Sequence, residues 1–328
     1  MEKNIIILSF IIFFVVGIFM YSDIFGILYE RNIHPLLNSF NRPSKYKEKL
    51  IVWTYLEEPS FLNRNIDIEL LNRHKNFTTL FKMCLKIMDK SINKKYYALH
   101  VITPENVKEY LPDFPIKMNA DSKYPLKFRV DLLASMILSK NGGLFLSPST
   151  LVMKNLDEIL YKLTFNYDLI TFGGSVNVVN SCDDKYNPSN YVIAAKKNNK
   201  TINLYKERML NHYKTYDFKN STGEVVFSNV LHELKPENHY HFDCSYTGYN
   251  DVNNNLIPLK EYYGFMPIQF KDKNSLIFIS LPYDTILENI QYQWFNNLSE
   301  DQFFNSKIQL TKLIYNRLNN LNLIQKVE

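Results

Sequence analysis

Short apolar segments alternate with helix-like segments over residues 50–172, and this alternation most constrains the fold. Residues 50–56 (LIVWTYL) and 96–102 (YYALHVI) are short, apolar and rich in β-formers, as buried strands are. Residues 78–92 lie between them and carry apolar side chains at helical spacing. A chain that alternates strands and helices in this way favours a parallel sheet covered by helices. The sequence therefore predicts an α/β domain.

The next predicted helix ends in a pair of glycines. Residues 125–140 (PLKFRVDLLASMILSK) place apolar side chains on one face of a helix. Gly142 and Gly143 follow, and glycine readily adopts the left-handed conformation that ends a helix. The apolar residues 144–146 come next and predict a central strand of the sheet.

A second glycine pair follows another predicted strand. Residues 167–172 (YDLITF) are strand-like, and Gly173 and Gly174 come directly after them. Glycine at a strand end lets a ligand approach the backbone closely. The two pairs are therefore either part of a binding site or two plain turns, and the pattern favours neither.

The carboxy-terminal part predicts a further strand at residues 275–280 and a helix at residues 304–324. The apolar face of that helix favours packing on the core over lying on a membrane. His239 and His241 alternate as in a strand, which favours surface histidines over a functional pair.

An uncharged apolar run occupies residues 5–21 (IIILSFIIFFVVGIFMY), which is long enough to cross most of a bilayer core as a helix. A cleaved signal peptide would end in small residues, which are missing here, so a retained anchor is favoured. We expect a membrane anchor at residues 1–29, a stem at 30–49 and a globular domain at 50–328. We expect a single-pass, type II orientation with a lumenal or external domain. The positive charges on the two sides of the run nearly balance, so the opposite orientation stays the alternative.

Charge and cysteine content exclude several classes of protein. The 38 Lys and Arg residues are scattered and matched by 33 acidic residues, so the net charge of +5 indicates no nucleic-acid partner. Cys84, Cys182 and Cys244 are odd in number and form no C-x-x-C pair, so no zinc site or disulfide framework is expected. A Cys182–Cys244 bridge would form only in an oxidising compartment.

The segment around the first glycine pair resembles the DXD-containing glycosyltransferases of the capsular polysaccharide synthesis and sugar-binding-region type. Their pattern is an S-D-x-x-R helix followed by G-G-[IVL]-[YFW]-[LM]-D-x-[DT]. Asp131 matches the family aspartate in its spacing to Gly142, and residues 142–146 (GGLFL) match the glycine strand. Residues 51–55 (IVWTY) resemble the first strand of the family, and residues 190–195 (NYVIAA) show weaker similarity. The resemblance implies a GT-A-like fold, with a mixed, mostly parallel sheet flanked by helices.

The chain departs from the family where the chemistry is concentrated. Ser147 and Ser149 stand at the two DXD positions, where the family's carboxylates hold a divalent metal, usually Mn²⁺ or Mg²⁺. Serine brings no negative charge for such a cation, so we expect no metal site. The family arginine falls on Ala134. Other charged candidates are the basic Lys127, Arg129 and Lys154 and the acidic Asp183, Asp184, Asp243 and Asp251.

The resemblance implies a membrane-anchored glycosyltransferase that moves a sugar from a nucleotide-sugar to a glycan acceptor. An inactive glycan- or partner-binding protein on the same fold is the alternative, because fold alone does not fix function. No catalytic residue can be named. The residues expected to bind the nucleotide-sugar are Asp131, Gly142, Gly143, Ser147, Ser149, Gly173 and Gly174.

Overall fold

The computed structural model describes residues 49–56, 78–118, 123–174, 182, 184–216 and 222–323. The described residues from Leu50 onward belong to one compact unit. The expected anchor at residues 5–21 lies outside the described residues, so the anchor, its orientation and the stem stay predictions. In the described part of the chain, no helix is both long enough and apolar enough to span a bilayer.

The main sheet has six strands in the order β2-β1-β3-β6-β5-β7. Strand β1 pairs in parallel with β2 and β3, β5 pairs in parallel with β7, and β6 runs antiparallel between β3 and β5. The strands are Leu50–Tyr55 (β1), Tyr97–Ile102 (β2), Gly143–Leu146 (β3), Leu169–Phe172 (β5), Ser189–Ala195 (β6) and His239–Phe242 (β7). The prediction of a mixed, mostly parallel sheet is therefore confirmed, and β3 lies in its interior.

The antiparallel strand β6 shapes the edge at which the parallel strands end. Leu146, the last residue of β3, pairs with Val192, and Phe172, the last residue of β5, pairs with Ser189. The first residues of β6 therefore lie beside the last residues of its two neighbours. We call this side of the sheet the carboxyl edge. Ligands of open α/β sheets bind in the crevice at this edge.

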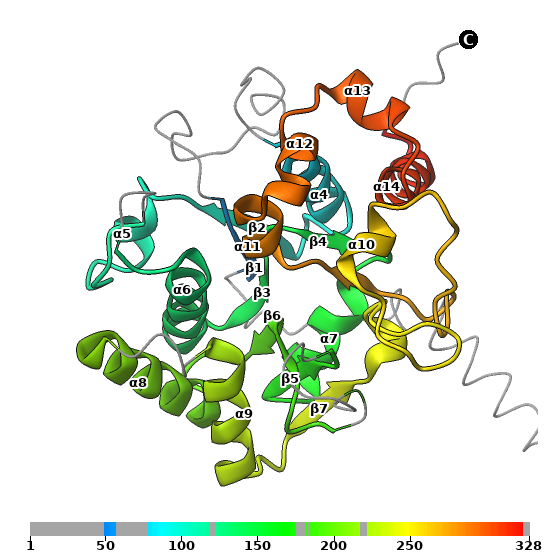
Figure 1. Cartoon of the computed structure of the whole chain (residues 1–328). Coiled ribbons are helices and arrows are strands. Elements are labelled where there is room, and N and C mark those ends of the chain that lie inside the picture. Colours follow the sequence, from blue (N-terminus) through cyan, green and yellow to red (C-terminus); the bar gives the residue numbers. More distant parts are fainter. Residues whose placement is uncertain are drawn as a thin grey trace, which may run out of the picture. The chain divides into compact units, whose positions relative to one another are not determined.

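Helices cover both faces of the sheet. Figure 1 shows α6, α8 and α9 together on one side of the sheet and α4 and α7 on the other. These helices, with the short α5, are Thr79–Lys90 (α4), Val107–Tyr110 (α5), Leu126–Asn141 (α6), Asp157–Phe165 (α7), Lys200–Thr215 (α8) and Gly223–Leu234 (α9). Helix α6 ends at Gly142, whose φ of 68° fits the predicted glycine end.

A second, two-stranded sheet joins the middle of the chain to its end. Strand β4 pairs antiparallel with β8, which lies in the strand predicted at residues 275–280. The elements of this region are Thr150–Val152 (β4), Leu259–Tyr262 (α10), Phe278–Ser280 (β8), Tyr283–Glu288 (α11), Ile290–Asn296 (α12), Glu300–Asn305 (α13) and Gln309–Asn320 (α14). The helix expected at residues 304–324 is thus two helices, divided near Lys307, whose φ is 57°. Its apolar face is buried in α14, as the core interpretation predicts.

One expectation about β7 needs correction, and one question about the cysteines is answered. His239 is buried and not on the surface, because β7 pairs with β5 and the Thr171 hydroxyl lies 2.7 Å from His239 Nε2. The same hydroxyl lies 2.9 Å from His241 Nδ1. Cys182 and Cys244 form a disulfide, so the bridge that the sequence left conditional is present.

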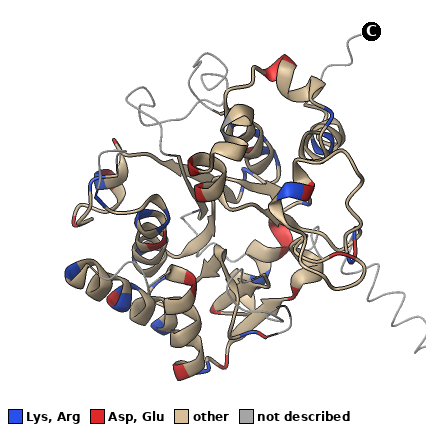
Figure 2. Ribbon diagram, in the orientation of Figure 1, with Lys and Arg blue, Asp and Glu red and all other residues tan. Residues whose placement is uncertain are grey.

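Charged residues are interspersed over the helices and loops. Figure 2 shows Lys and Arg on most helices, with Asp and Glu among them. The expectation of no nucleic-acid partner stays a prediction from the sequence.

Candidate functional site

Asp131 joins helix α6 to the start of helix α9. Its Oδ2 accepts a hydrogen bond from the backbone N–H of Gly223, at 3.0 Å. Gly223 is the first residue of α9, and the N-cap Thr222 accepts from the N–H of Val225. A carboxylate at a helix N-terminus is stabilised by the exposed N–H groups and the helix dipole. Asp131 therefore helps to hold α6 and α9 together.

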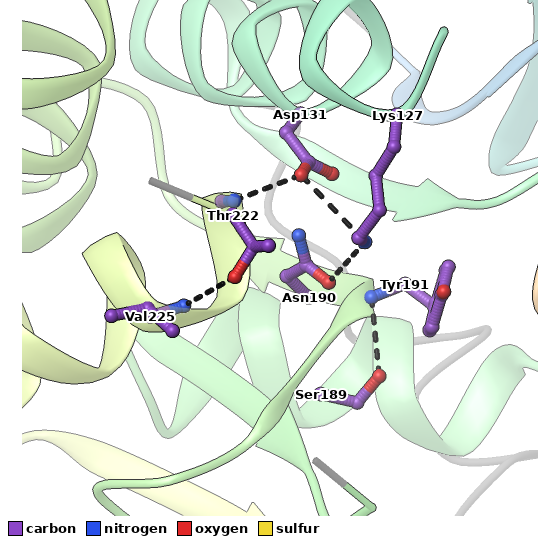
Figure 3. Close-up of polar contacts among 8 residues, drawn as sticks. Lys127, Asp131, Ser189, Asn190, Tyr191, Thr222 and Val225 are labelled. Atoms are coloured by element: carbon purple, nitrogen blue, oxygen red, sulfur yellow. Dashed lines mark hydrogen bonds and ion pairs between the residues drawn. The ribbon is translucent and has the colours of Figure 1, made fainter. Parts of the chain in front are cut away.

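Lys127 lies one turn before Asp131 on the same face of α6. Its Nζ is 3.7 Å from Asp131 Oδ2 and donates to Asn190 Oδ1 at 3.3 Å. The ammonium also lies 4.4 Å from the centre of the Tyr191 ring, in a cation–π contact. Figure 3 shows both side chains of α6 pointing toward the first residues of β6 and the start of α9. The Lys127 side chain, which is 18% exposed, is therefore held by three partners at the carboxyl edge.

Tyr191 connects this ion pair to helix α11. Its ring meets the ring of Tyr283 edge-on, with the centroids 5.9 Å apart. Burial raises the pKa of both Tyr283 and Asp131, and the charge of Asp284, which follows Tyr283 in the chain, adds to this effect. We call the following set the polar cluster: Lys127, Asp131, Asn190, Tyr191, Glu224, Tyr249, Tyr283 and Asp284.

Burial dominates the electrostatics of the polar cluster. It raises the pKa of Asp131 from 3.8 to about 6, although Lys127 and the Gly223 N–H favour the charged form. Burial lowers the pKa of Lys127, but the charges of Asp131, Tyr191 and neighbouring carboxylates outweigh it, so the pKa of Lys127 is raised overall. A neutral lysine is therefore excluded at physiological pH, whereas Asp131 changes charge in a mildly acidic range.

Asp131 is expected to make the protein less stable as the pH rises from about 4 to about 6. The folded state holds this proton more tightly than the unfolded chain does, so stability is full at low pH and falls through this window. The displacement of the pKa from 3.8 to about 6 corresponds to about 3 kcal/mol. Urea unfolding of the wild type and of Asp131→Asn should show this fall as a pH dependence of the stability difference between the two proteins, because the other titrating groups act equally on both. Parallel pH profiles for the two proteins would contradict it.

The two serines at the DXD positions are buried, and their hydroxyls are engaged. Ser147 Oγ lies 2.8 Å from Thr150 Oγ1, and Ser149 Oγ donates to the carbonyl of Leu281 at 2.6 Å. Ser147 also donates its backbone N–H to Tyr191 at 2.8 Å, which places it at the carboxyl edge. The serines thus hold together the segments around the polar cluster.

These serines do not fit the divalent metal that the family pattern implies. Neither is a carboxylate, and both hydroxyls are used within the protein. Among the described residues, no group of three or more His, Cys, Asp or Glu side chains is arranged to hold a metal ion.

The first glycine pair lies at the opposite end of β3 from Ser147. A Cβ on Gly143 would lie 2.2 Å from the carbonyl oxygen of Ile51, and one on Gly142 would lie 2.5 Å from the backbone nitrogen of Lys197. The carbonyl of Gly142 accepts from Trp53 Nε1 at 2.8 Å. Close packing within the protein therefore explains both glycines. The structure does not bring them to Asp131.

The second glycine pair follows β5 and so lies at the carboxyl edge. A Cβ on Gly173 would lie 2.8 Å from the backbone of both Cys182 and Cys244. A Cβ on Gly174 would lie 2.7 Å from the ring of Tyr249, a member of the polar cluster. This pair borders the cluster, as expected, and its role in binding nucleotide stays a prediction, as do the roles of Asp131 and the serines.

The remaining charged candidates lie apart from the cluster or serve local structure. Arg129 is buried and donates to the carbonyl of Tyr124, and Lys154 is exposed. The carboxylates of Asp184, Asp243 and Asp251 accept hydrogen bonds within their own turns. Asp183 lies outside the described residues.

Sequence reasoning identified Asp131 and Lys127 but missed the rest of the polar cluster. Asn190 and Tyr191 carry a usable signal, because they are polar residues directly before the apolar run VIAA. Glu224 follows the Thr222-Gly223 helix start, and Tyr283 and Asp284 follow a strand and Pro282. Only the folded chain shows that these separate segments meet.

Comparison with known proteins gives one family match. A sequence profile described as "capsular polysaccharide synthesis protein" matches residues 72–253, more than half of the 328-residue chain. The matched range includes Lys127, Asp131, Asn190, Tyr191 and the start of α9. No curated protein matches the chain.

Several solved glycosyltransferases resemble the structure distantly. GlyE of Streptococcus pneumoniae TIGR4 has 9% identity over 85% of this chain and 66% of that chain, with a TM-score of 0.35. A glycosyltransferase involved in the glycosylation of the major capsid of PBCV-1 has 10% identity over 71% of this chain and 94% of that chain, with a TM-score of 0.35. The galactosyltransferase LgtC has 9% identity over 84% of this chain and 98% of that chain, with a TM-score of 0.32. TM-scores of this size establish no common function.

Proposed function

Because the chain belongs to the capsular polysaccharide synthesis protein family, we propose that it is a glycosyltransferase that transfers a sugar from a nucleotide-sugar to a glycan acceptor. The polar cluster is the main support. Buried ionisable side chains are costly and concentrate at functional sites. This cluster lies at the edge of the sheet where α/β proteins bind ligands.

The proposed reaction breaks the bond between the sugar C1 and the diphosphate oxygen, and the electron pair leaves with the nucleotide. A bond forms from C1 to an acceptor hydroxyl oxygen, whose proton is released to solvent. Negative charge develops on the departing diphosphate, and a preorganised cation can stabilise it. Lys127 is the cation of the polar cluster, and its position is fixed by Asp131, Asn190 and Tyr191. We assign it to the diphosphate, and we assign the carboxylates and tyrosines to the donor sugar.

We further propose a membrane-anchored, type II arrangement with the domain on the lumenal or external side. The uncharged run at residues 5–21 supports the anchor. The Cys182–Cys244 disulfide supports the oxidising side of the membrane, because disulfides are rare in the cytosol.

An inactive glycan- or partner-binding protein is the second candidate. The inward-facing hydroxyls of Ser147 and Ser149 favour it, since a donor cannot use them without breaking contacts of the core. Binding of a nucleotide-sugar without transfer or hydrolysis of the sugar would identify this case.

The test measures nucleotide-sugar binding and hydrolysis by the full-length protein, in Mn²⁺ and in EDTA. We expect binding and sugar release under both conditions. Gly223→Ala should weaken binding by about tenfold or more, because its Cβ would lie 2.4 Å from Asp131 Oδ2 and displace that carboxylate. The matched control is Gly264→Ala, whose Cβ would lie no closer than 3.3 Å to another atom. Absence of binding under both conditions, or an absolute need for Mn²⁺, would contradict the proposal.

A further inference from the structure

The polar cluster contains a carboxylate that forms no ion pair among the described residues. Lys127 pairs with Asp131, at 3.7 Å. Asp284 has a buried Oδ1 without a hydrogen-bond partner among the described residues, and no Lys, Arg or His of that part of the chain forms an ion pair with it. The charges of Asp284 and Glu224 both act on Lys127 and Asp131. The polar cluster therefore holds three carboxylates, those of Asp131, Glu224 and Asp284, and one cation, Lys127.

Two buried tyrosine hydroxyls of the polar cluster also form no hydrogen bond among the described residues. Tyr283 is 1% exposed, and within the described residues its OH forms no hydrogen bond. The buried OH of Tyr249 likewise forms no hydrogen bond with a described residue, and the Tyr249 ring packs against Gly174. Buried polar atoms are normally satisfied by protein, water or ligand. A carboxylate accepts hydrogen bonds and a hydroxyl both donates and accepts them, so these groups suit a ligand that does both, as a sugar hydroxyl does.

The rings of the cluster add flat apolar surfaces to these polar groups. Tyr191 and Tyr283 meet edge-on with their centroids 5.9 Å apart, and Lys127 already occupies one face of Tyr191. Aromatic faces also attract cationic groups, so an ammonium on a sugar would be favoured here. A carboxylate on the sugar would instead face Asp284 in a poorly solvated site, where like charges repel strongly.

We propose that this site selects an uncharged or amino sugar as the donor and excludes a uronate, with Asp284 as the residue that sets this specificity. The proposal rests on the proposed function, because it assigns the polar cluster to the donor sugar. It names the chemical class of the sugar, which neither the family match nor the fold specifies.

The experiment compares donors that share a nucleotide and differ only in the charge of the sugar. Full-length protein is titrated with UDP-glucose, UDP-glucosamine and UDP-glucuronate, and with GDP-mannose and GDP-mannuronate. With the nucleotide that the protein binds, we expect the uronate donor to bind at least about tenfold more weakly than the neutral donor. UDP-glucosamine should bind as well as UDP-glucose or better. Asp284→Asn should reduce the uronate penalty to about threefold or less, while Glu237→Gln, at an exposed acid, should leave it unchanged.

Tyr283→Phe provides a second variant that removes only the hydroxyl. It should weaken neutral donors and uronates alike, so the ratio between them should stay constant. Equal affinity for a uronate and its neutral partner in the wild type would overturn the inference and leave the proposed function intact. Failure of every nucleotide-sugar to bind would overturn both. A uronate penalty that persists unchanged in Asp284→Asn would overturn the role of Asp284.

Discussion

Replacing Lys127 with Met is expected to lower the free energy of unfolding by about 3–5 kcal/mol at pH 8, the range for breaking a buried ion pair. The Met side chain fills a similar volume, but it leaves Asp131, which is only 4% exposed, without its cation. The loss should shrink at pH 5, because Asp131 can then take up a proton and avoid the unpaired charge. Urea unfolding at both pH values measures the effect. Lys140→Met, at an exposed lysine of the same helix, should change stability by no more than about 0.5 kcal/mol.

A double variant separates the ion pair from simple packing. Lys127→Met combined with Asp131→Asn removes both charges, and the amide oxygen can still accept from Gly223. We expect the pair to recover more than half of the stability lost in the single variant, because replacing both partners is far less costly than removing one. Additive losses would show that Lys127 acts through packing and that its charge contributes nothing.

Removing the Cys182–Cys244 disulfide is expected to destabilise the domain by about 4 kcal/mol, since the bridge closes a loop with a sequence separation of 62 residues. The bond restricts the unfolded chain, and it also ties the segment before β6 to the end of β7. Unfolding in urea with and without dithiothreitol should show the loss in the wild type. The double variant Cys182→Ala/Cys244→Ala should be equally unstable in both conditions. Alkylation of all three cysteines in the untreated native sequence, after unfolding, would refute the bridge.

Local patterns in the sequence were enough to place the strands and helices around β3. Strands β1 and β2 and helices α4 and α6 lie where apolar periodicity and glycine or threonine boundaries predict them. Such patterns report which face of an element is buried, and α4 obeys them. Helix α6 does not, because it is buried around most of its circumference, so the expectation of a single apolar face was wrong there. The internal position of β3 also follows from its uniformly apolar sequence.

Pairing between distant strands could not be predicted in the same way. The apolar residues 190–195 fit a strand, but nothing local indicates that β6 runs antiparallel between β3 and β5. The pairing of β4 with β8 likewise depends on the whole chain. The same limit applies to the site, because the engagement of Ser149 with Leu281 becomes visible only once β8 and α11 are in place. A strand's neighbours are set by tertiary packing and not by its own sequence.

The polar cluster draws its members from separate stretches of the chain: α6, the start of β6, the start of α9, the chain after β7 and the start of α11. Contacts between residues so far apart in sequence carry a high loop-closure cost and form late in folding. A chain that stopped after β7 would retain every strand of the main sheet and yet lack Tyr249, Tyr283 and Asp284. Ligand affinity would therefore report whether the whole chain has folded. A fragment with a native-like circular dichroism spectrum could still fail to bind its substrate.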